Sequence, residues 1–218
     1  MKTGKKTLEI MSTATWYNNW LLKQISSHLG GNILEVGAGI GNFTSKLSKY
    51  GKVTAIDYDP NYKNANYGDI EKGKYFFGKK IFNTIVCMNV LEHIENDNRA
   101  LTNMYNLLGT GGKLILLVPA FNFAYSGIDK DLGHFRRYTK KLAGSRMKKA
   151  GFQIIENKYL NWLGLVGWIV NGKILNKRII PKGQLGTFDK LARPFLLFEE
   201  LVKPLFGISV LVIGEKNN

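Results

Sequence analysis

The sequence predicts an α/β fold around a mostly parallel sheet, and three observations lead to this prediction. Short apolar runs recur along the chain at residues 32–36, 53–56, 82–88 and 113–118. They are apolar on both faces, which is typical of parallel strands that helices cover on each side. Helical segments alternate with these runs, and a glycine-rich turn joins the first run to the helix that follows. This alternation favours a single, doubly covered sheet.

Helices are expected where a capping residue or a stopping glycine bounds a longer segment. Ser12 can cap the first of them and Thr139 the last, while Gly30, Gly51 and Gly151 are natural stops. The expected helices cover residues 12–29, 42–49, 95–108 and 139–149.

Two further strands are expected near the C-terminus, at residues 152–160 and 208–215. The stretch between them, residues 161–207, is too long for a bare loop. It contains two helical segments rich in apolar and aromatic residues, LGLVGWIVNGKIL and FDKLARPFLLFEELVKPLF. The sequence therefore predicts one domain over residues 1–218, with 161–207 as a helical insertion or cap between the last two strands.

Composition and charge set limits on the class of protein. The chain has 218 residues, 44% hydrophobic and 22% charged, which is the composition of a globular protein. Its formal net charge is +15, and residues 126–218 hold 17 Lys and Arg against 7 Asp and Glu, a net of +10. This excess fits either a well-solvated, lysine-rich surface or an anionic partner.

The sequence predicts a cytoplasmic protein, with a peripheral position at the inner membrane face as a further possibility. No apolar run reaches the roughly 20 residues of a membrane span, and no leader pattern is visible at the start. The single cysteine, Cys87, cannot form an internal disulfide, which favours a reducing compartment. The sequence makes no prediction of oligomeric state.

The glycine turn LEVGAGIGNF predicts a nucleotide site of a particular kind. Gly37, Gly39 and Gly41 follow the spacing G-x-G-x-G, whereas a dinucleotide fingerprint needs G-x-G-x-x-G. No Gly-Lys-Ser/Thr follows, so the turn is not a P-loop. Glu35 precedes the turn and suits a ligand with a cationic amino group better than a pyrophosphate.

Two more carboxylates follow at the ends of strands. Asp57 ends the second expected strand, where it can accept hydrogen bonds from the hydroxyls of a ribose. Asp69, in NYGDI, stands at the expected edge of the third strand and can accept a hydrogen bond from an adenine amino group. A cationic amino acid end, a ribose and an adenine together predict S-adenosylmethionine as the ligand.

These motifs resemble those of the class I S-adenosylmethionine-dependent methyltransferases. LEVGAGIGNFT is similar to the family's first motif, AIDYDP to the second and NYGDI to the third. CMNVLEHIEND resembles the segment after strand four, and LLGTGGKLILLVP the fifth strand with its preceding turn. The resemblance covers roughly residues 12–160. It implies a Rossmann-like sheet of seven strands with a reversed last strand, which fits the final run ISVLVIGEK.

The resemblance also implies which residues surround the cofactor. Glu35 is added to this set because it precedes the glycine turn. Tyr17 is expected to form part of an aromatic lid near the sulfonium. The alternative for Tyr17, Trp16 and Trp20 is that they are core residues of the first helix, where positions 17 and 20 share a face. The residues implied by the family pattern are Gly37, Gly39, Asp57, Tyr58, Asp69, Ile70 and Asn89.

Methyl transfer from a sulfonium is an in-line displacement with a neutral leaving group, so the protein mainly aligns the two reactants. An oxygen or nitrogen acceptor can need a base, and His134 and His93 are the catalytic candidates. The alternative for each is a structural or substrate-binding histidine. The three histidines and one cysteine show no metal-ligand spacing, and no metal is expected.

Arg136, Arg137 and Tyr138 are expected to bind the acceptor. They lie between Pro119 and the helix that Thr139 caps, where a loop can cross the mouth of a pocket. The two arginines can pair with an anionic group such as a phosphate.

The class of acceptor follows from weaker signals. Members that methylate nucleic-acid bases often carry Asn/Asp-Pro-Pro-Tyr/Phe where this chain has NVLE, and no RNA-binding module is visible, which argues against nucleic acid. DLGHFRRYTKKL and NWLGLVGWIVNGKIL resemble a bacterial and archaeal subset often associated with glycosyltransferases of surface-polysaccharide assembly. This favours an oxygen or nitrogen acceptor on a glycan, glycolipid or related amphiphilic precursor. A small quinone-like molecule, or a non-catalytic S-adenosylmethionine-binding protein, are the alternatives.

Residues 161–205 are a candidate membrane contact. The apolar stretch 162–170 is followed by Lys173, Lys177 and Arg178, a pattern typical of an interfacial helix near anionic lipid. The alternative is a helical cap that covers the active site.

Overall fold

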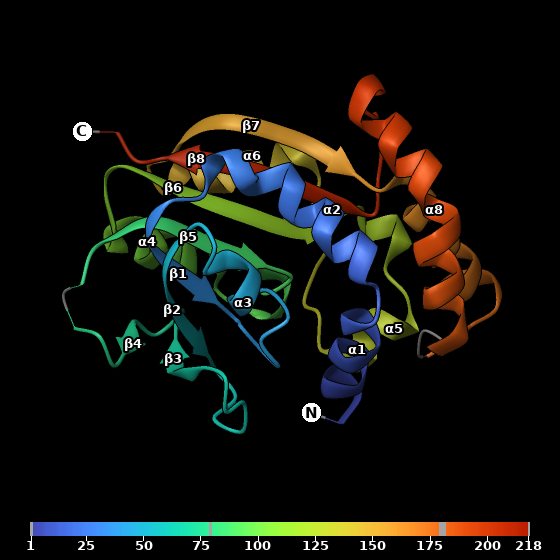
Figure 1. The fold of residues 1–218 in the computed structure, drawn as a ribbon, viewed down its shortest axis with the longest axis horizontal. Coiled ribbons are helices and arrows are strands. Elements are labelled where there is room, and N and C mark those ends of the chain that lie inside the picture. The colour runs from blue at the N-terminus through green and yellow to red at the C-terminus, as the bar shows by residue number, and fades with distance from the viewer. Residues whose placement is uncertain (1, 79, 179–181, 218) are drawn as a thin grey trace.

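The chain folds into one sheet with helices on both faces (Figure 1). The computed structural model describes residues 2–78, 80–178 and 182–217. The strands lie in the order β4-β3-β2-β1-β5-β6-β8-β7. Their bounds are β1 Gly31–Val36, β2 Gly51–Asp57, β3 Asn66–Asp69, β4 Lys74–Tyr75, β5 Phe82–Met88, β6 Leu108–Pro119, β7 Gln153–Leu160 and β8 Ser209–Glu215.

The strand directions confirm the predicted sheet. β1 pairs in parallel with β2 and β5, β2 pairs in parallel with β3, and β5 with β6. β8, the last strand in the sequence, runs antiparallel to both of its neighbours, β6 and β7. The sheet has eight strands rather than seven because the two-residue β4 pairs with β3 at the edge.

Helices follow the predicted alternation with the strands. Thr139 caps α6 as predicted, its hydroxyl accepting the N–H of Leu142 at 3.2 Å. The helices are α1 Lys2–Ser12, α2 Thr15–Ile25, α3 Thr44–Leu47, α4 Asp97–Leu107, α5 Gly127–Leu132, α6 Lys140–Lys149, α7 Trp162–Ile169 and α8 Lys182–Val202.

The predicted start of the first helix at Ser12 is wrong. Ser12 ends α1, and its hydroxyl donates to the carbonyl of Glu9 at 2.7 Å. α2 begins only after Ala14, which offers no side-chain cap. The Ser12 hydroxyl is hydrogen-bonded to a carbonyl of α1 and does not cap the free N–H groups at the start of α2. The predicted single helix is therefore interrupted, and α1 and α2 are separate helices.

The chain between β7 and β8 forms α7, a π-helical turn over Val170–Ile174, and α8. Acidic side chains attach α8 to the rest of the molecule. Asp189 accepts the backbone N–H of Tyr17 on α2 at 2.8 Å. Glu199 accepts the N–H of Asn161 and Trp162 at 2.6 and 3.0 Å, at the start of α7. These bonds satisfy N–H groups at the starts of α2 and α7, which have no partner within their own helices.

Two apolar cores lie on opposite faces of the sheet. Neighbouring residues of β1 belong to different cores, Ile33 to one and Leu34 to the other, because side chains alternate along a strand. α4 and α6 cover the core of Leu34, whereas α2 and α8 cover that of Ile33. Among the described helices α8 is the longest at 21 residues, and none combines the length and apolar character that a bilayer crossing requires.

A buried ion pair connects α5 to the strand end of β6. Arg137 is only 1% exposed, and its Nε donates to Asp129 Oδ1 at 2.8 Å. Its Nη1 donates to the carbonyl of Ala120 at 3.1 Å, and its guanidinium lies 4.6 Å from the ring centroid of Trp168 on α7. Against the burial that raises it, hydrogen bonds from His134 and Arg137 hold the pKa of Asp129 below its ordinary value.

We expect Arg137→Leu to lower the free energy of unfolding by about 3–5 kcal/mol, because the carboxylate of Asp129 is left buried without its guanidinium. Arg178→Leu is the matched control, since its pair with Asp131 has side-chain exposures of 65% and 33%. The control should cost no more than about 1 kcal/mol. Urea unfolding of both variants measures the difference, and equal losses would contradict a structural role for the buried pair.

Candidate active site

The glycine turn is held against β2 by its backbone. The N–H groups of Gly37 and Ala38 both donate to the carbonyl of Ile56, at 2.8 and 3.1 Å. Gly37 has a φ of +75°, and a Cβ there would lie 2.2 Å from a methyl group of Val90. Both the left-handed backbone and the close approach require glycine at this position. The turn therefore presents bare backbone at the carboxyl edge of the sheet.

Asp57 lies beside the turn at the end of β2. Its Oδ2 accepts the N–H of Gly39 at 2.8 Å, and its Oδ1 accepts the N–H of Asp59 at 2.9 Å. Partial burial raises the pKa of Asp57 above its ordinary value, while these two hydrogen bonds oppose the shift. Tyr58 follows with 66% of its surface exposed. The carboxylate is thus fixed in orientation while its neighbour stays open to solvent.

Glu35 is buried beneath the same turn. It is 6% exposed, and its carboxylate accepts the hydroxyl hydrogen of Thr44 at 2.6 Å. Burial, and to a smaller extent the nearby Asp57, raise the pKa of Glu35 to about 7 against the effect of Thr44. Among the described residues its partner is a hydroxyl rather than a cation. A cationic ligand group would favour the ionised form of this carboxyl group.

The remaining predicted cofactor residues lie at two further strand ends. Asp69 ends β3 and Ile70 follows it, and each is 5% exposed. Asp69 Oδ1 accepts the N–H of Lys72 at 2.9 Å. Asn89 follows β5 with a φ of +55°, and its N–H donates to the carbonyl of Leu117 at 2.8 Å. The strand order β3-β2-β1-β5 brings these ends together with Asp57 along one edge of the sheet.

Tyr17 lies in the core between α2 and α8 rather than over the glycine turn. It is 7% exposed and stacks on Trp20, with ring centroids 5.7 Å apart. Burial raises the pKa of Tyr17 to about 12. A hydrogen bond with Asn161 opposes this shift, and the charge of Glu199 adds to it. The structure therefore supports the alternative, in which Tyr17 is a core residue and not part of an aromatic lid.

A segment that the sequence analysis did not consider covers the turn instead. The side chain of Leu8 on α1 lies 2.8 Å from the position that a Cβ on Gly39 would take. The backbone carbonyl of Leu8 also accepts a hydrogen bond from Asn42 Nδ2 at 3.3 Å. The misplaced helix start at Ser12 hid this arrangement, because it left the first residues of the chain without a structure.

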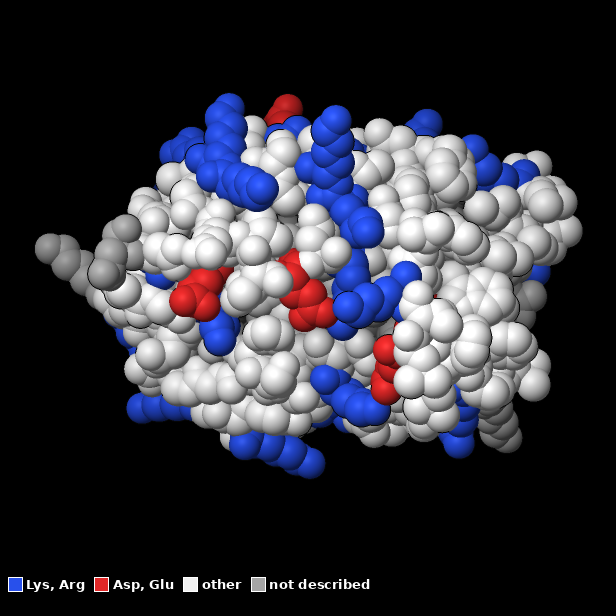
Figure 2. All heavy atoms as spheres, turned by 90° about the horizontal axis from the view of Figure 1, so that it is seen from above, with Lys and Arg blue, Asp and Glu red and all other residues white. Residues whose placement is uncertain are grey.

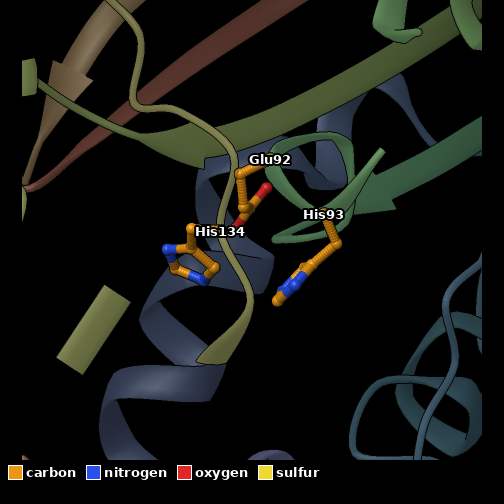
Figure 3. Close-up of side chains that lie close together, drawn as sticks. All are labelled: Glu92, His93 and His134. Atoms are coloured by element: carbon orange, nitrogen blue, oxygen red, sulfur yellow. The ribbon is translucent and has the colours of Figure 1, made fainter. Parts of the chain in front are cut away.

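Two turns of the chain bring His93 and His134 together (Figure 3). His93 and Glu92 lie in a short 3₁₀ turn over Leu91–His93, directly after β5, and His134 follows α5. The two imidazole rings meet edge to face with centroids 4.6 Å apart. His134 Nδ1 lies 2.8 Å from Asp129 Oδ1, so the carboxylate that binds Arg137 also orients this histidine.

The pKa values of two residues in this cluster, Glu92 and His93, are shifted far from their ordinary values. Burial raises the pKa of Glu92 to about 8, and its residue is only 1% exposed. The surrounding protein, followed by the neighbouring His134, lowers the pKa of His93 to about 4, although one side of His93 faces solvent. Both shifts favour the uncharged forms of these side chains. Shifted pKa values of this kind are typical of functional sites.

The three residues predicted to bind substrate have different environments. Arg137 is buried in its ion pair, and Tyr138 is fully buried with its hydroxyl 2.9 Å from Asp97 Oδ2. Both are therefore reassigned from substrate binding to structure. Arg136 is partly exposed, pairs with Asp97 at 3.1 Å and donates to the backbone carbonyls of residues 94 and 95. It lines an open, polar hollow of about 560 Å³ rather than the histidine cluster.

A glycine turn on β1, carboxylates at the next strand ends and a reversed β8 define the class I methyltransferase fold, whose methyl donor is S-adenosylmethionine. The chain matches the methyltransferase domain family over residues 19–157 and belongs to that family. The family resemblance of the motifs is thereby confirmed, and the chain is a methyltransferase.

Solved structures show the same fold. An S-adenosylmethionine-dependent methyltransferase from Archaeoglobus fulgidus superposes with a TM-score of 0.62 at 13% identity, covering 90% of this chain and 91% of that one. The N-methyltransferase NodS from Bradyrhizobium japonicum, in complex with S-adenosylhomocysteine, superposes with a TM-score of 0.55 at 16% identity, covering 93% and 86%.

Curated relatives include two ubiquinone biosynthesis O-methyltransferases. The protein from Xanthomonas euvesicatoria is 27% identical over 61% of this chain and 68% of its own length. The mitochondrial protein from Schizosaccharomyces pombe is 26% identical over 52% of this chain and 47% of its own length. The chain thus spans only part of the length of these relatives.

We expect Asp57→Ala to weaken S-adenosylmethionine binding by about 1–3 kcal/mol, because ribose hydroxyls would lose their acceptor. Glu200→Ala removes the same charge from α8, where Glu200 pairs with Lys23 at 2.7 Å, and should bind the cofactor as the wild type does. Isothermal titration calorimetry with S-adenosylhomocysteine measures both variants. Unchanged affinity in Asp57→Ala would remove the ribose assignment.

Proposed function

We propose that this protein methylates an oxygen or nitrogen atom of an amphiphilic small molecule, with a hydroxyl of a glycolipid-like or ring-containing precursor as the favoured acceptor. One observation carries this proposal. The Glu92–His93–His134 cluster lies at the carboxyl end of β5, next to β1 and its glycine turn. In an open α/β sheet, ligands bind at this edge.

The cofactor half of the proposed site follows the strand ends. Glu35 faces the amino group of the methionine end, and the bare backbone at Gly37 and Gly39 accommodates the chain between this end and the ribose. Asp57 accepts hydrogen bonds from the ribose, with Tyr58 at the open side. Asp69, Ile70 and Asn89 complete the adenine end and the wall toward the acceptor.

His134 and His93 are the proposed catalytic residues, because they contact the acceptor beside the sulfonium. The acceptor oxygen forms a bond to the methyl carbon while the carbon–sulfur bond breaks, and the electron pair stays on the neutral thioether. The hydroxyl proton leaves to the cluster and then to solvent. Alignment of the oxygen, the methyl carbon and the sulfur supplies most of the rate enhancement.

The exposed face of α8 supports an amphiphilic acceptor and a peripheral membrane contact. Its carboxylates Asp189 and Glu199 are buried and accept backbone N–H groups of the protein body, and the exposed Glu200 is paired with Lys23. Trp168, in contrast, donates its indole N–H to Ala124 and packs on Arg137, so this side chain does not add to the apolar surface. On α8 and directly after it, the exposed apolar residues are Leu191, Phe195, Leu197, Phe198, Leu201, Val202, Leu205 and Phe206. Val166, Val170, Ile174 and Leu175, on α7 and in the turn after it, are exposed as well.

Basic side chains accompany this face. Viewed from above Figure 1, lysines and arginines outnumber acidic side chains, and a largely uncharged area lies toward α8 (Figure 2). Lys203 follows α8 directly, within the part of the chain that has a net charge of +10. An apolar face beside cations matches the surface of an anionic bilayer, where each cation contributes about 1 kcal/mol.

A quinone-like ring is the second candidate acceptor, and the similarity to two ubiquinone biosynthesis O-methyltransferases favours it. Such a ring with an apolar tail is itself amphiphilic, so the α8 surface is compatible with both candidates. The two differ in their products, because a methylated ring absorbs ultraviolet light and a methylated glycan does not. A binding protein without catalysis would give no labelled product at all.

We expect the wild type to transfer labelled methyl groups into a lipid-extractable fraction of cell extract. His134→Gln should lower turnover by at least about 100-fold, because a group that contacts the reacting atom is lost, with cofactor affinity within a few-fold. His28→Gln is the control, since His28 pairs with Glu156 at 3.4 Å outside the cluster. Full turnover in His134→Gln, or label confined to protein, would contradict the proposed site.

We expect the protein to co-sediment with phosphatidylglycerol vesicles at low salt and to dissociate in part at high salt. Leu201→Glu should abolish this binding, because Leu201 is 81% exposed on α8. Phe76→Glu is the control, since Phe76 is also exposed, at 57%, but adjoins β4 at the other edge of the sheet. Equal binding by both variants would remove α8 from the contact.

A further inference from the structure

Glu92, His93 and His134 also form a set of metal ligands, and we propose that they hold a divalent transition-metal cation. One candidate atom from each residue, either an imidazole nitrogen or a carboxylate oxygen, lies within 4.8 Å of the other two. Two neutral imidazoles and one carboxylate are a common donor set for Zn²⁺, Mn²⁺, Fe²⁺ and Co²⁺. The spacing of the histidines along the chain shows no ligand pattern, so the sequence by itself predicts no metal.

The hydrogen bond to Asp129 determines which nitrogen of His134 is available. In neutral His134, Nδ1–H donates to Asp129 Oδ1 across 2.8 Å, so Nε2 keeps its lone pair. Metal-bound histidines generally donate their other N–H to a carboxylate or a carbonyl in this way. The backbone of Gly133 and Leu132 raises the pKa of His93 against its burial, so polar backbone groups also adjoin this ring. The imidazole of His134 is therefore oriented before an ion binds.

The carboxylate of Glu92 provides an independent observation. Its Oε2 is buried and has no hydrogen-bond partner among the described residues. An unpartnered buried oxygen normally costs free energy, so native structures rarely leave one without a reason. Glu92 also offers one carboxylate oxygen to the cluster with the two imidazoles. A shared cation would give the carboxylate a partner and would bind both rings.

The geometry leaves an open position on the ion. Zn²⁺ binds nitrogen and oxygen at about 2.0–2.2 Å, which places tetrahedral ligand atoms about 3.3 Å apart. Closing from 4.8 Å therefore requires each atom to move by less than about 1 Å, which side-chain rotation can supply. Glu92 is buried, whereas His93 is open to solvent on one side. Three protein ligands and a solvent-facing side describe a catalytic rather than a structural metal site.

This inference deepens the proposed function, and only the role of the ion rests on that function. An acceptor hydroxyl in the open position would bind the cation and release its proton to solvent more readily. The oxygen would then attack the methyl carbon as described above. With the ion bound, the imidazole lone pairs bind the metal, so His93 and His134 would act through the ion instead of contacting the acceptor or taking its proton. Asp129 remains a positioning residue.

Co²⁺ added to metal-stripped protein, without donor or acceptor, tests the binding. We expect visible ligand-field absorption that saturates at a single equivalent, and calorimetry with Zn²⁺ should give the same stoichiometry. Glu92→Gln preserves the shape of the side chain, and His93→Ala changes a partly exposed one. Each variant should lose more than about ten-fold in affinity, since even outer partners of metal ligands change affinity by 10–100-fold.

His28→Ala is the matched control, because it also removes a histidine that neighbours a glutamate, and it should bind Co²⁺ as the wild type does. Circular dichroism verifies that the variants fold. If Glu92→Gln does not fold, the Co²⁺ affinity of His93→Ala decides whether the cluster binds the metal. An absence of saturable binding by the wild type, or equal binding by wild type and His93→Ala, would overturn the inference.

The metal and the methyl transfer can fail separately. Full methyl transfer by metal-stripped protein, with no Co²⁺ binding, would remove the ion and leave the proposed function intact. Saturable, cluster-dependent Co²⁺ binding without any methylated product would leave the metal site and remove the proposed acceptor chemistry.

Discussion

The carboxylate of Asp129 is the group on which the acceptor side of this molecule depends. It accepts hydrogen bonds from the backbone of Ser126, from Arg137 and from His134, each within 2.8 Å. Burial makes an unpaired carboxylate costly, so these donors are held firmly in place. Through Arg137 the same charge fixes Trp168 of α7, and through His134 it orients one side of the histidine cluster. One buried charge thus couples the helical insertion to the candidate active site.

The insertion is attached to the body by a similar principle. Asp189 and Glu199 on α8 accept backbone N–H groups at the starts of α2 and α7, while burial raises the pKa of Glu199. Directing these acids inward leaves the outer face of α8 apolar. A surface of this kind suits a lipid headgroup boundary or an amphiphilic ligand better than bulk water.

The strand ends that form the cofactor half of the proposed site could be predicted from the sequence, because their determinants are local. Gly37 and Gly39 are needed for a turn of a few residues, and Glu35 and Asp57 each end or adjoin a recognisable strand. Parallel strands then bring their carboxyl ends to one edge whatever the details of packing. The reversed β8 followed in the same way from the family resemblance, whereas the short β4 and the helix α1 that covers the turn were missed.

What the sequence determined by itself is therefore the fold, the methyl donor and the strand ends at which the proposed cofactor site lies. Only the tertiary structure decided the acceptor side. Arg137 and Tyr138 look like surface ligands in the sequence, but Asp129 and Asp97 draw them into the core. His93 and His134 come together because α5 folds back onto the turn after β5. Such contacts depend on which buried charges find partners across distant segments, and no local pattern of residues encodes that choice.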